Sequence, residues 1–172
     1  MSLSQIQTDT ISISSVNNFL DNLDKAKNYS PASNTCTRNG FQTHNIISSI
    51  HISALEEIYN KVQAYLKTVI KNCIYYEFYI DYMHLIHYNN GGWQVGHTHS
   101  EYEDYSFILY LNDSDGDTVI YEGKDIIRIT PERGKIVFFD SNYYHESSIC
   151  SKEKKVAVGS IKFRHKIWEP KK

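Results

Sequence analysis

The chain has 172 residues and a formal charge of −2, which suits one domain and argues against a nucleic-acid-binding surface. Hydrophobic residues make up 41% of the chain, but no apolar run approaches the roughly 18 residues of a membrane span, and the first residues lack the pattern of a signal peptide. Three cysteines without CxxC spacing, Cys36, Cys73 and Cys150, predict free thiols in a reducing cytoplasm.

The first 73 residues predict two helices separated by a loop. Ser15 is a candidate cap for a helix over residues 16–27. Residues 28–40, with Ser, Asn, Pro and Gly, predict a loop. Ser53 is a candidate cap for a second helix that runs to about residue 71. Apolar side chains recur along one face of this second helix at three- and four-residue spacing: Leu55, Ile58, Val62, Leu66 and Ile70.

From residue 74 onward the pattern changes to short strands rich in Tyr, Ile and Val. Asn-Gly, Asp-Gly and Pro-containing segments separate these strands. Many short strands after a helical start predict a mainly β fold, an antiparallel barrel or jelly roll with the helices against one sheet face. The expected strands are 75–88, 93–99, 105–111, 118–121, 125–129, 135–139 and 155–163.

The segment that carries most information on function contains His97 and His99. Residues i and i+2 of a strand point to the same side, so the two imidazoles are expected to lie together. His145, just past an apolar strand, is the best candidate for a third ligand of a mid-row transition metal. Glu101 continues the same face and is an alternative carboxylate ligand, and Asp104 is a weaker one.

The order of these features resembles that of the 2-oxoglutarate/iron(II) oxygenase superfamily, especially its prolyl-hydroxylase-like and small bacterial and phage branches. The resemblance covers roughly residues 82–163. It rests on five segments in order: Tyr88-Asn89-Asn90-Gly91-Gly92 before the histidine pair, the pair itself, Phe107-Ile108-Leu109-Tyr110-Leu111-Asn112, Pro131-Glu132-Arg133-Gly134 with the apolar strand that follows, and His145 with Lys155 ten residues later.

The resemblance implies a double-stranded β-helix over residues 74–172, a helical support over residues 1–73, and a single domain. It also implies an iron(II)- and 2-oxoglutarate-dependent dioxygenase that hydroxylates a peptide residue or a small metabolite, without catalytic residues beyond the metal site. Lys155, Tyr110 and Tyr88 are the residues expected to bind 2-oxoglutarate.

The chain departs from the family motif His-x-Asp/Glu in one respect. Spacing from Tyr88 aligns His97 with the first histidine of the motif, which places His99 where the acidic residue belongs. We therefore favour His97, His99 and His145 as ligands, while a shifted register with His99 and Glu101 restores a carboxylate.

Two other functions fit the same residues. One is a cupin-like metal enzyme that does not use 2-oxoglutarate, which three histidines favour and the spacing of Lys155 disfavours. The other is a non-catalytic barrel-fold binding protein. The sequence predicts no nucleic-acid or membrane partner, and it does not reveal the substrate or the oligomeric state.

Overall fold

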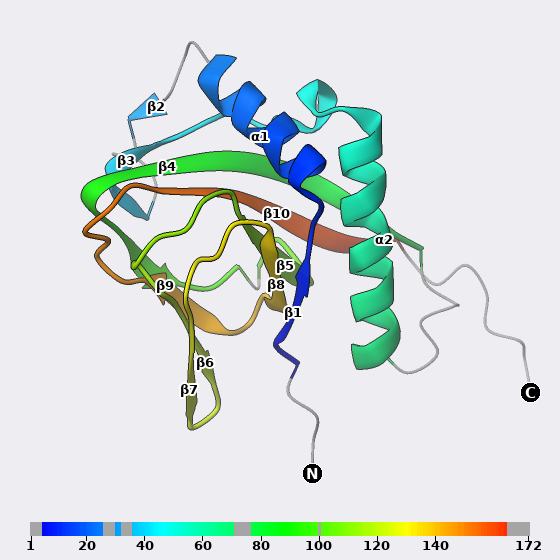
Figure 1. Ribbon diagram of the computed structural model, residues 1–172. Coiled ribbons are helices and arrows are strands. Elements are labelled where there is room, and N and C mark those ends of the chain that lie inside the picture. Colours follow the sequence, from blue (N-terminus) through cyan, green and yellow to red (C-terminus); the bar gives the residue numbers. More distant parts are fainter. Residues whose placement is uncertain (1–4, 26–29, 32–35, 71–76, 100, 165–172) are drawn as a thin grey trace, which may run out of the picture.

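The computed structural model describes residues 5–25, 30–31, 36–70, 77–99 and 101–164. Within this part, the chain folds as a curled antiparallel sheet with two α-helices on one face (Figure 1). The elements are β1 (Gln7–Thr10), α1 (Ile13–Lys25), β2 (Ser30–Pro31), β3 (Thr37–Gln42), a 3₁₀ turn (Ile47–Ser49), α2 (Ile52–Val69), β4 (Glu77–His97), β5 (Tyr105–Tyr110), β6 (Thr118–Glu122), β7 (Asp125–Ile129), β8 (Lys135–Asp140), β9 (Tyr144–Ser147) and β10 (Lys154–Arg164).

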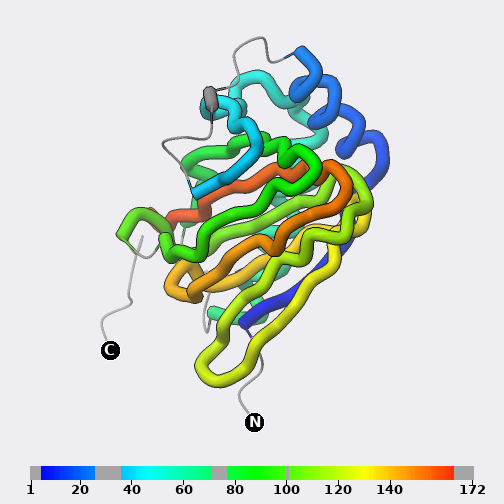
Figure 2. Tube along the Cα trace, turned by 90° about the vertical axis from the view of Figure 1, so that its left-hand side faces the viewer, coloured from blue at the N-terminus to red at the C-terminus, as the bar shows by residue number. Residues whose placement is uncertain are grey.

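Strand β4 connects the two halves of the sheet. Neighbouring strands follow the order β1-β8-β5-β10-β4-β9-β6-β7, and β3 also pairs with β4. Tyr88 of β4 lies opposite Lys154 of β10, whereas Gln94, six residues later, lies opposite Ser147 of β9. The strand thus leaves one half of the sheet and enters the other, and the sheet curls around an interior (Figure 2).

The predicted interruption at residues 89–92 is wrong, because β4 continues through it. Gly91 adopts a φ of 81° there, a conformation that glycine accepts without strain. Strands β1, β2, β3 and β9 were not predicted, and β2 and part of β3 fall in residues 28–40, which were expected to form a loop; these segments are too short or too polar to show an alternating pattern. The other strands agree with the prediction to within a few residues, and the mainly β fold is confirmed.

The two helices form where expected but begin earlier. α2 starts at Ile52 rather than after Ser53, and the His51 side chain caps it by accepting a hydrogen bond from the Ser53 backbone N–H. α1 starts at Ile13, so Ser15 lies inside it. α2 ends at Val69, two residues before the expected end near residue 71, whereas the expected end of the first helix near residue 27 lies outside the described residues.

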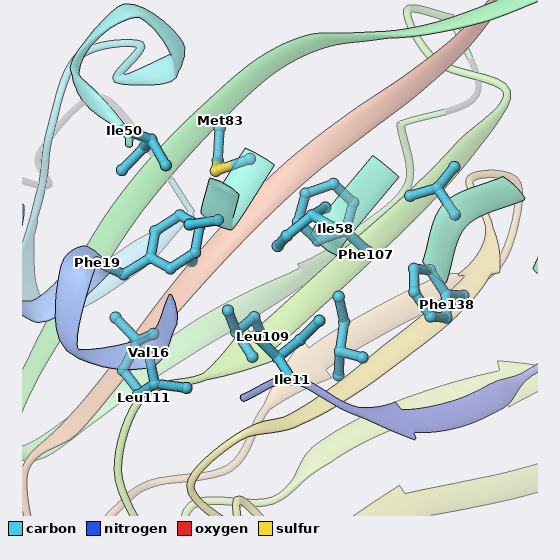
Figure 3. Close-up of a cluster of buried hydrophobic side chains, with 14 of the residues drawn as sticks. Ile11, Val16, Phe19, Ile50, Ile58, Met83, Phe107, Leu109, Leu111 and Phe138 are labelled. Carbon is cyan, nitrogen blue, oxygen red and sulfur yellow. The ribbon is translucent and has the colours of Figure 1, made fainter. Parts of the chain in front are cut away.

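The main hydrophobic core lies between the helices and the outer face of the sheet (Figure 3). Phe19 of α1 and Ile58 of α2 are fully buried against strand residues such as Met83. This burial explains the apolar stripes of both helices. The residues labelled in Figure 3 are Ile11, Val16, Phe19, Ile50, Ile58, Met83, Phe107, Leu109, Leu111 and Phe138.

The opposite face of the sheet encloses a smaller core with polar residues at its edge. Alternate residues of the strands point to this interior, so Ile86 and Ile108 face it while Leu85 and Leu109 face the helices. Phe139 and Val156 complete the apolar wall. The polar side chains described next extend from this inner face. None of the described helices is long and apolar enough to cross a membrane.

Candidate active site

Three histidines meet at the inner face of the curled sheet. His97 is the last residue of β4 and lies opposite His145 of β9, so strand pairing alone brings the two together. His99 lies just past the strand, where its backbone N–H donates to the Ser141 carbonyl at 3.0 Å. The ring of His145 is 4.4 Å from that of His97 and 5.3 Å from that of His99, measured between centroids. One nitrogen of each ring lies within 4.8 Å of the others.

The Nδ1 atom of each ring has an acceptor of its own. Nδ1 of His97 lies 2.8 Å from the Val95 carbonyl, and Nδ1 of His145 lies 3.0 Å from the Tyr143 carbonyl. A carbonyl oxygen only accepts, so both Nδ1 atoms carry the proton. In His99 the Nδ1 atom faces a carboxylate oxygen of Glu103 at 3.2 Å. These acceptors leave the three Nε2 lone pairs free for a ligand.

Burial keeps the three rings neutral. It lowers the pKa of His97 and of His99 below the usual value, and it lowers the pKa of His145 to about 3. The Nε2 atoms of His97 and His99 are nevertheless only 2.8 Å apart. When the proton of His99 is on Nδ1, facing Glu103, two lone pairs face each other at this distance, an arrangement that a bound cation relieves.

The residues present fit a transition metal. Two imidazole nitrogens that bind one metal ion at about 2.1 Å and at a right angle are about 3.0 Å apart. The observed separation of 2.8 Å is close to that value. Three neutral nitrogen donors suit a mid-row divalent ion.

The two acidic residues considered from the sequence do not join the histidines. Glu101 is an exposed turn residue. Asp104 accepts a hydrogen bond from the backbone N–H of Phe163 at 2.9 Å, which holds its carboxylate at the end of β10. Among the described residues, the converging metal-binding group consists of His97, His99 and His145.

The carboxylate that reaches the site is Glu103, which sequence reasoning missed. Its side chain is 1% exposed and contacts His99. It accepts hydrogen bonds from the hydroxyls of Tyr82 and of Ser106. The one signal in the sequence was an acidic residue four positions after His99, but its importance depends on contacts across the turn.

The structure also separates Lys155 from the inner face. Its ammonium lies 3.2 Å from Glu153, on the outside of β10. The neighbouring Lys154 points inward instead, because successive side chains of a strand alternate. Its Nζ donates to the Gly116 carbonyl at 2.7 Å and to the Ser147 hydroxyl at 2.8 Å. Of the two lysines, Lys154 therefore faces the inner side of the sheet and Lys155 faces its outside.

Tyr88 and Tyr110, the other two residues predicted to bind 2-oxoglutarate, flank Lys154. Its Nζ lies 5.4 Å from the ring centre of Tyr88 and 5.7 Å from that of Tyr110. The Tyr110 hydroxyl donates to the Thr118 hydroxyl at 2.7 Å. The structure thus brings the two predicted tyrosines together around a lysine.

Lys154 is a buried cation that forms no ion pair with an acidic residue in the described part of the chain. Burial lowers the pKa of Lys154 to about 7. A buried charge without a counter-ion is costly, and an anionic ligand removes that cost. Ser147, which touches Lys154, and His145 are two residues apart on one strand, which corresponds to about 7 Å.

A cavity of about 130 Å³ lies beside the histidines. His99 and His145 reach it, together with the polar side chains of Gln42, His84 and Gln94. Nδ1 of His84 lies 2.9 Å from the Thr43 carbonyl, so its Nε2 remains available as an acceptor. The other wall of the cavity is apolar and includes Ile86, Ile108, Phe139 and Val158.

Comparison with known proteins gives both a family and a fold. Residues 73–161 match the sequence profile of the 2OG-Fe(II) oxygenase superfamily. No curated protein matches the chain by sequence. Among solved structures, the chain is similar to a prolyl-4-hydroxylase from Pseudomonas putida, with a TM-score of 0.74, 15% identity and 95% of each chain covered.

Two further structures are similar over most of their length. A viral collagen prolyl hydroxylase from Paramecium Bursaria Chlorella virus-1, in complex with 2-oxoglutarate, has a TM-score of 0.67 and 15% identity, with 92% of this chain and 96% of that chain covered. A prolyl hydroxylase from Trichoplax adhaerens, bound to a peptide of hypoxia inducible factor, has a TM-score of 0.69 and 14% identity, with 91% and 83% covered.

Proposed function

Because this chain belongs to the 2OG-Fe(II) oxygenase superfamily, we propose that His97, His99 and His145 hold its iron(II). The enzyme is a non-haem, 2-oxoglutarate-dependent dioxygenase with the double-stranded β-helix fold. The main observation in favour of this ligand set is that the three imidazole rings converge through one nitrogen each, while the Nδ1 atom of each ring faces an oxygen atom.

We assign the distal carboxylate of 2-oxoglutarate to Lys154, with Tyr88 and Tyr110 around it. This assignment is supported by the buried ammonium, which has no acidic partner among the described residues, and by its contact with Ser147, which lies two residues from His145 on β9. When bound, iron and 2-oxoglutarate would supply the oxidising chemistry: with dioxygen as the oxidant, the cosubstrate would lose carbon dioxide to give succinate, and a substrate C–H bond would become C–OH.

The residues of the chain contribute binding, orientation and exclusion of water. The backbone carbonyls of Val95 and Tyr143 fix the tautomers of His97 and His145, so that the metal-binding nitrogens face inward. Lys154 neutralises the far carboxylate of the cosubstrate. The apolar wall keeps water away from the reacting centre: Ile86, Ile108, Phe139 and Val158.

The substrate is proposed to be a peptide residue or a small polar metabolite. A cavity of about 130 Å³ takes a group of side-chain size. Gln42, His84 and Gln94 offer neutral hydrogen-bonding atoms at its polar side. The three similar structures described above are prolyl hydroxylases, one of them bound to a peptide, which agrees with a peptide substrate.

The chain is also proposed to form one domain. β1 pairs with β8 and β3 pairs with β4, so the part before residue 74 adds strands to the sheet as well as the two helices.

The pair His97→Ala and Glu101→Ala tests the ligand set and the activity together. Iron-loaded protein supplied with 2-oxoglutarate and oxygen should form succinate. His97→Ala should eliminate this turnover because a metal–nitrogen bond is lost, whereas Glu101→Ala should leave it close to the parent level because that carboxylate is exposed. Succinate is measured by chromatography under identical metal loading. An active His97→Ala beside an inactive Glu101→Ala would contradict the assignment and favour the shifted register.

The pH dependence of 2-oxoglutarate binding tests the role of Lys154. The lysine binds a carboxylate only while protonated, and its pKa in the free protein is about 7. Affinity should therefore be highest below pH 7 and should fall as pH rises above 7, by up to about tenfold per pH unit. Iron binding should change little over the same range, because the lowered pKa values of the histidines keep them neutral. Binding is measured by calorimetry between pH 6 and 9, and a flat profile would argue against Lys154.

A further inference from the structure

The ligand set leaves the iron without a protein anion in contact with it. The family motif places an acidic residue where this chain has His99, and three neutral imidazoles contribute no charge. A carboxylate is nevertheless buried next to the site. Glu103 lies 3.2 Å from Nδ1 of His99, while Nε2 of the same ring faces His97.

Glu103 is held in place by hydrogen bonds of both its backbone and its side chain. Its backbone N–H donates to the His99 carbonyl at 3.1 Å, which fixes the turn between the two residues. Its side chain, 1% exposed, accepts hydrogen bonds from Tyr82 and Ser106. The Ser106 hydroxyl also lies 2.9 Å from the Ser141 hydroxyl, so the carboxylate is tied to the turn before β9.

These contacts favour an ionised carboxylate that interacts with His99. Two hydroxyls donate to Glu103, and a carboxylate that receives donors from several sides is best satisfied as an anion. Burial raises the pKa of Glu103 above its usual value, and the hydrogen bonds from Tyr82 and Ser106 offset only part of that rise. No lysine or arginine of the described residues forms an ion pair with it, and the ring nitrogen that faces it is Nδ1 of the neutral His99.

We propose that Glu103 is the positioning residue of the metal centre, and that it supplies through the His99 ring the negative charge that the ligand set lacks. This proposal rests on the assignment of His97, His99 and His145 as ligands. A carboxylate at Nδ1 fixes the ring orientation and makes Nε2 a stronger donor. Glu103 acts through His99 and does not itself bind the metal, because its oxygen lies at the ring nitrogen opposite to the metal-facing one.

Glu103→Gln tests the proposal because glutamine has the same shape without the charge. Titrated with Co²⁺ alone, the variant should still bind one ion per chain, but about 10–100-fold more weakly than the parent, the usual effect of losing such a partner. The visible absorption of bound Co²⁺ should also shift, because the donor strength of His99 falls. Glu101→Gln, an exposed carboxylate on the same turn, is the matched control and should change neither quantity.

Two additional variants keep the test decisive if Glu103→Gln folds poorly. Glu103→Asp retains the charge and should recover part of the affinity, while Tyr82→Phe removes one donor to the carboxylate and should weaken binding in the same direction as Glu103→Gln. Thermal unfolding of each metal-free variant shows whether the fold is intact.

The outcomes separate this proposal from the one on which it rests. If the parent binds Co²⁺ and His97→Ala does not, the ligand set stands whatever Glu103→Gln does. Parent-like affinity and absorption in Glu103→Gln would then overturn the positioning role. A loss as complete as that of His97→Ala would also overturn it, because Glu103 would then be a ligand. A parent protein that binds no metal would contradict the ligand set itself.

Discussion

Replacing His145 by alanine should remove tight metal binding altogether. His145 is the most buried of the three proposed ligands, 3% exposed, and two remaining imidazoles seldom hold iron. The loss should exceed the roughly 100-fold that follows from removing a hydrogen-bond partner of a ligand. Calorimetric titration of the metal-free protein with Fe²⁺ under anaerobic conditions, or with Mn²⁺ as a surrogate, measures the effect.

His87→Ala is the matched control for this variant. His87 also belongs to β4, but its Nε2 lies 3.0 Å from Glu153 on the outer face of the sheet. Its removal should leave metal affinity unchanged. Equal stoichiometry and affinity in His145→Ala and the parent would remove His145 from the site.

Replacing Lys154 by methionine should weaken 2-oxoglutarate binding by about 1.5–3 kcal/mol, the range for losing a charged hydrogen bond. That is roughly 10- to 150-fold in the dissociation constant. Methionine preserves most of the buried volume, and iron affinity should be nearly unchanged because Lys154 contacts Ser147 and Gly116 rather than the histidines. Calorimetry with the metal-loaded protein measures both constants.

Lys155→Met is the control, because this neighbour lies beside Glu153 on the outside of the strand. It should bind 2-oxoglutarate as the parent does. A larger loss in Lys155→Met than in Lys154→Met would restore the lysine that the sequence indicated. The pH dependence predicted above should also disappear in Lys154→Met, since no titrating ammonium remains.

The difference between these two lysines shows where sequence reasoning succeeds and where it stops. A basic residue near the start of the last strand could be predicted from its distance to His145. Adjacent strand residues point to opposite faces, so the lysine nine positions after His145 faces the interior and the lysine ten positions after it faces outward. The pairing of Lys154 with Tyr88 settles the face, and that register depends on the path of residues 148–153, which carry no periodic pattern.

The convergence of the three histidines was predictable because it depends less on the register of the strands. His97 and His99 are close in sequence, so their proximity depends little on the fold, although His99 lies just beyond the strand. His145 required only that an apolar strand end near them. Glu103 was not predictable in this way, because its role arises from contacts with Tyr82, Ser106 and His99 that form only when three segments pack together.

The helices and strands likewise could be predicted where their pattern is local and not where it depends on pairing. The apolar stripe of α2 and the short apolar runs of β5 and β8 were recognisable because these patterns are local. β4 was predicted as two strands, since residues 89–92 have the composition of a turn. In the folded protein this segment carries the strand from one half of the sheet to the other, and pairing on both sides overrides local preference.

The most direct test of the proposed site is an anaerobic titration of 2-oxoglutarate into the iron(II)-loaded protein, followed by visible absorption. Chelation of the iron by the keto acid should produce a charge-transfer band that saturates at one equivalent per chain. The band should be absent in His145→Ala and should require higher 2-oxoglutarate concentrations in Lys154→Met. A parent protein that binds one iron per chain but develops no band, or a band that persists in His145→Ala, would contradict the account.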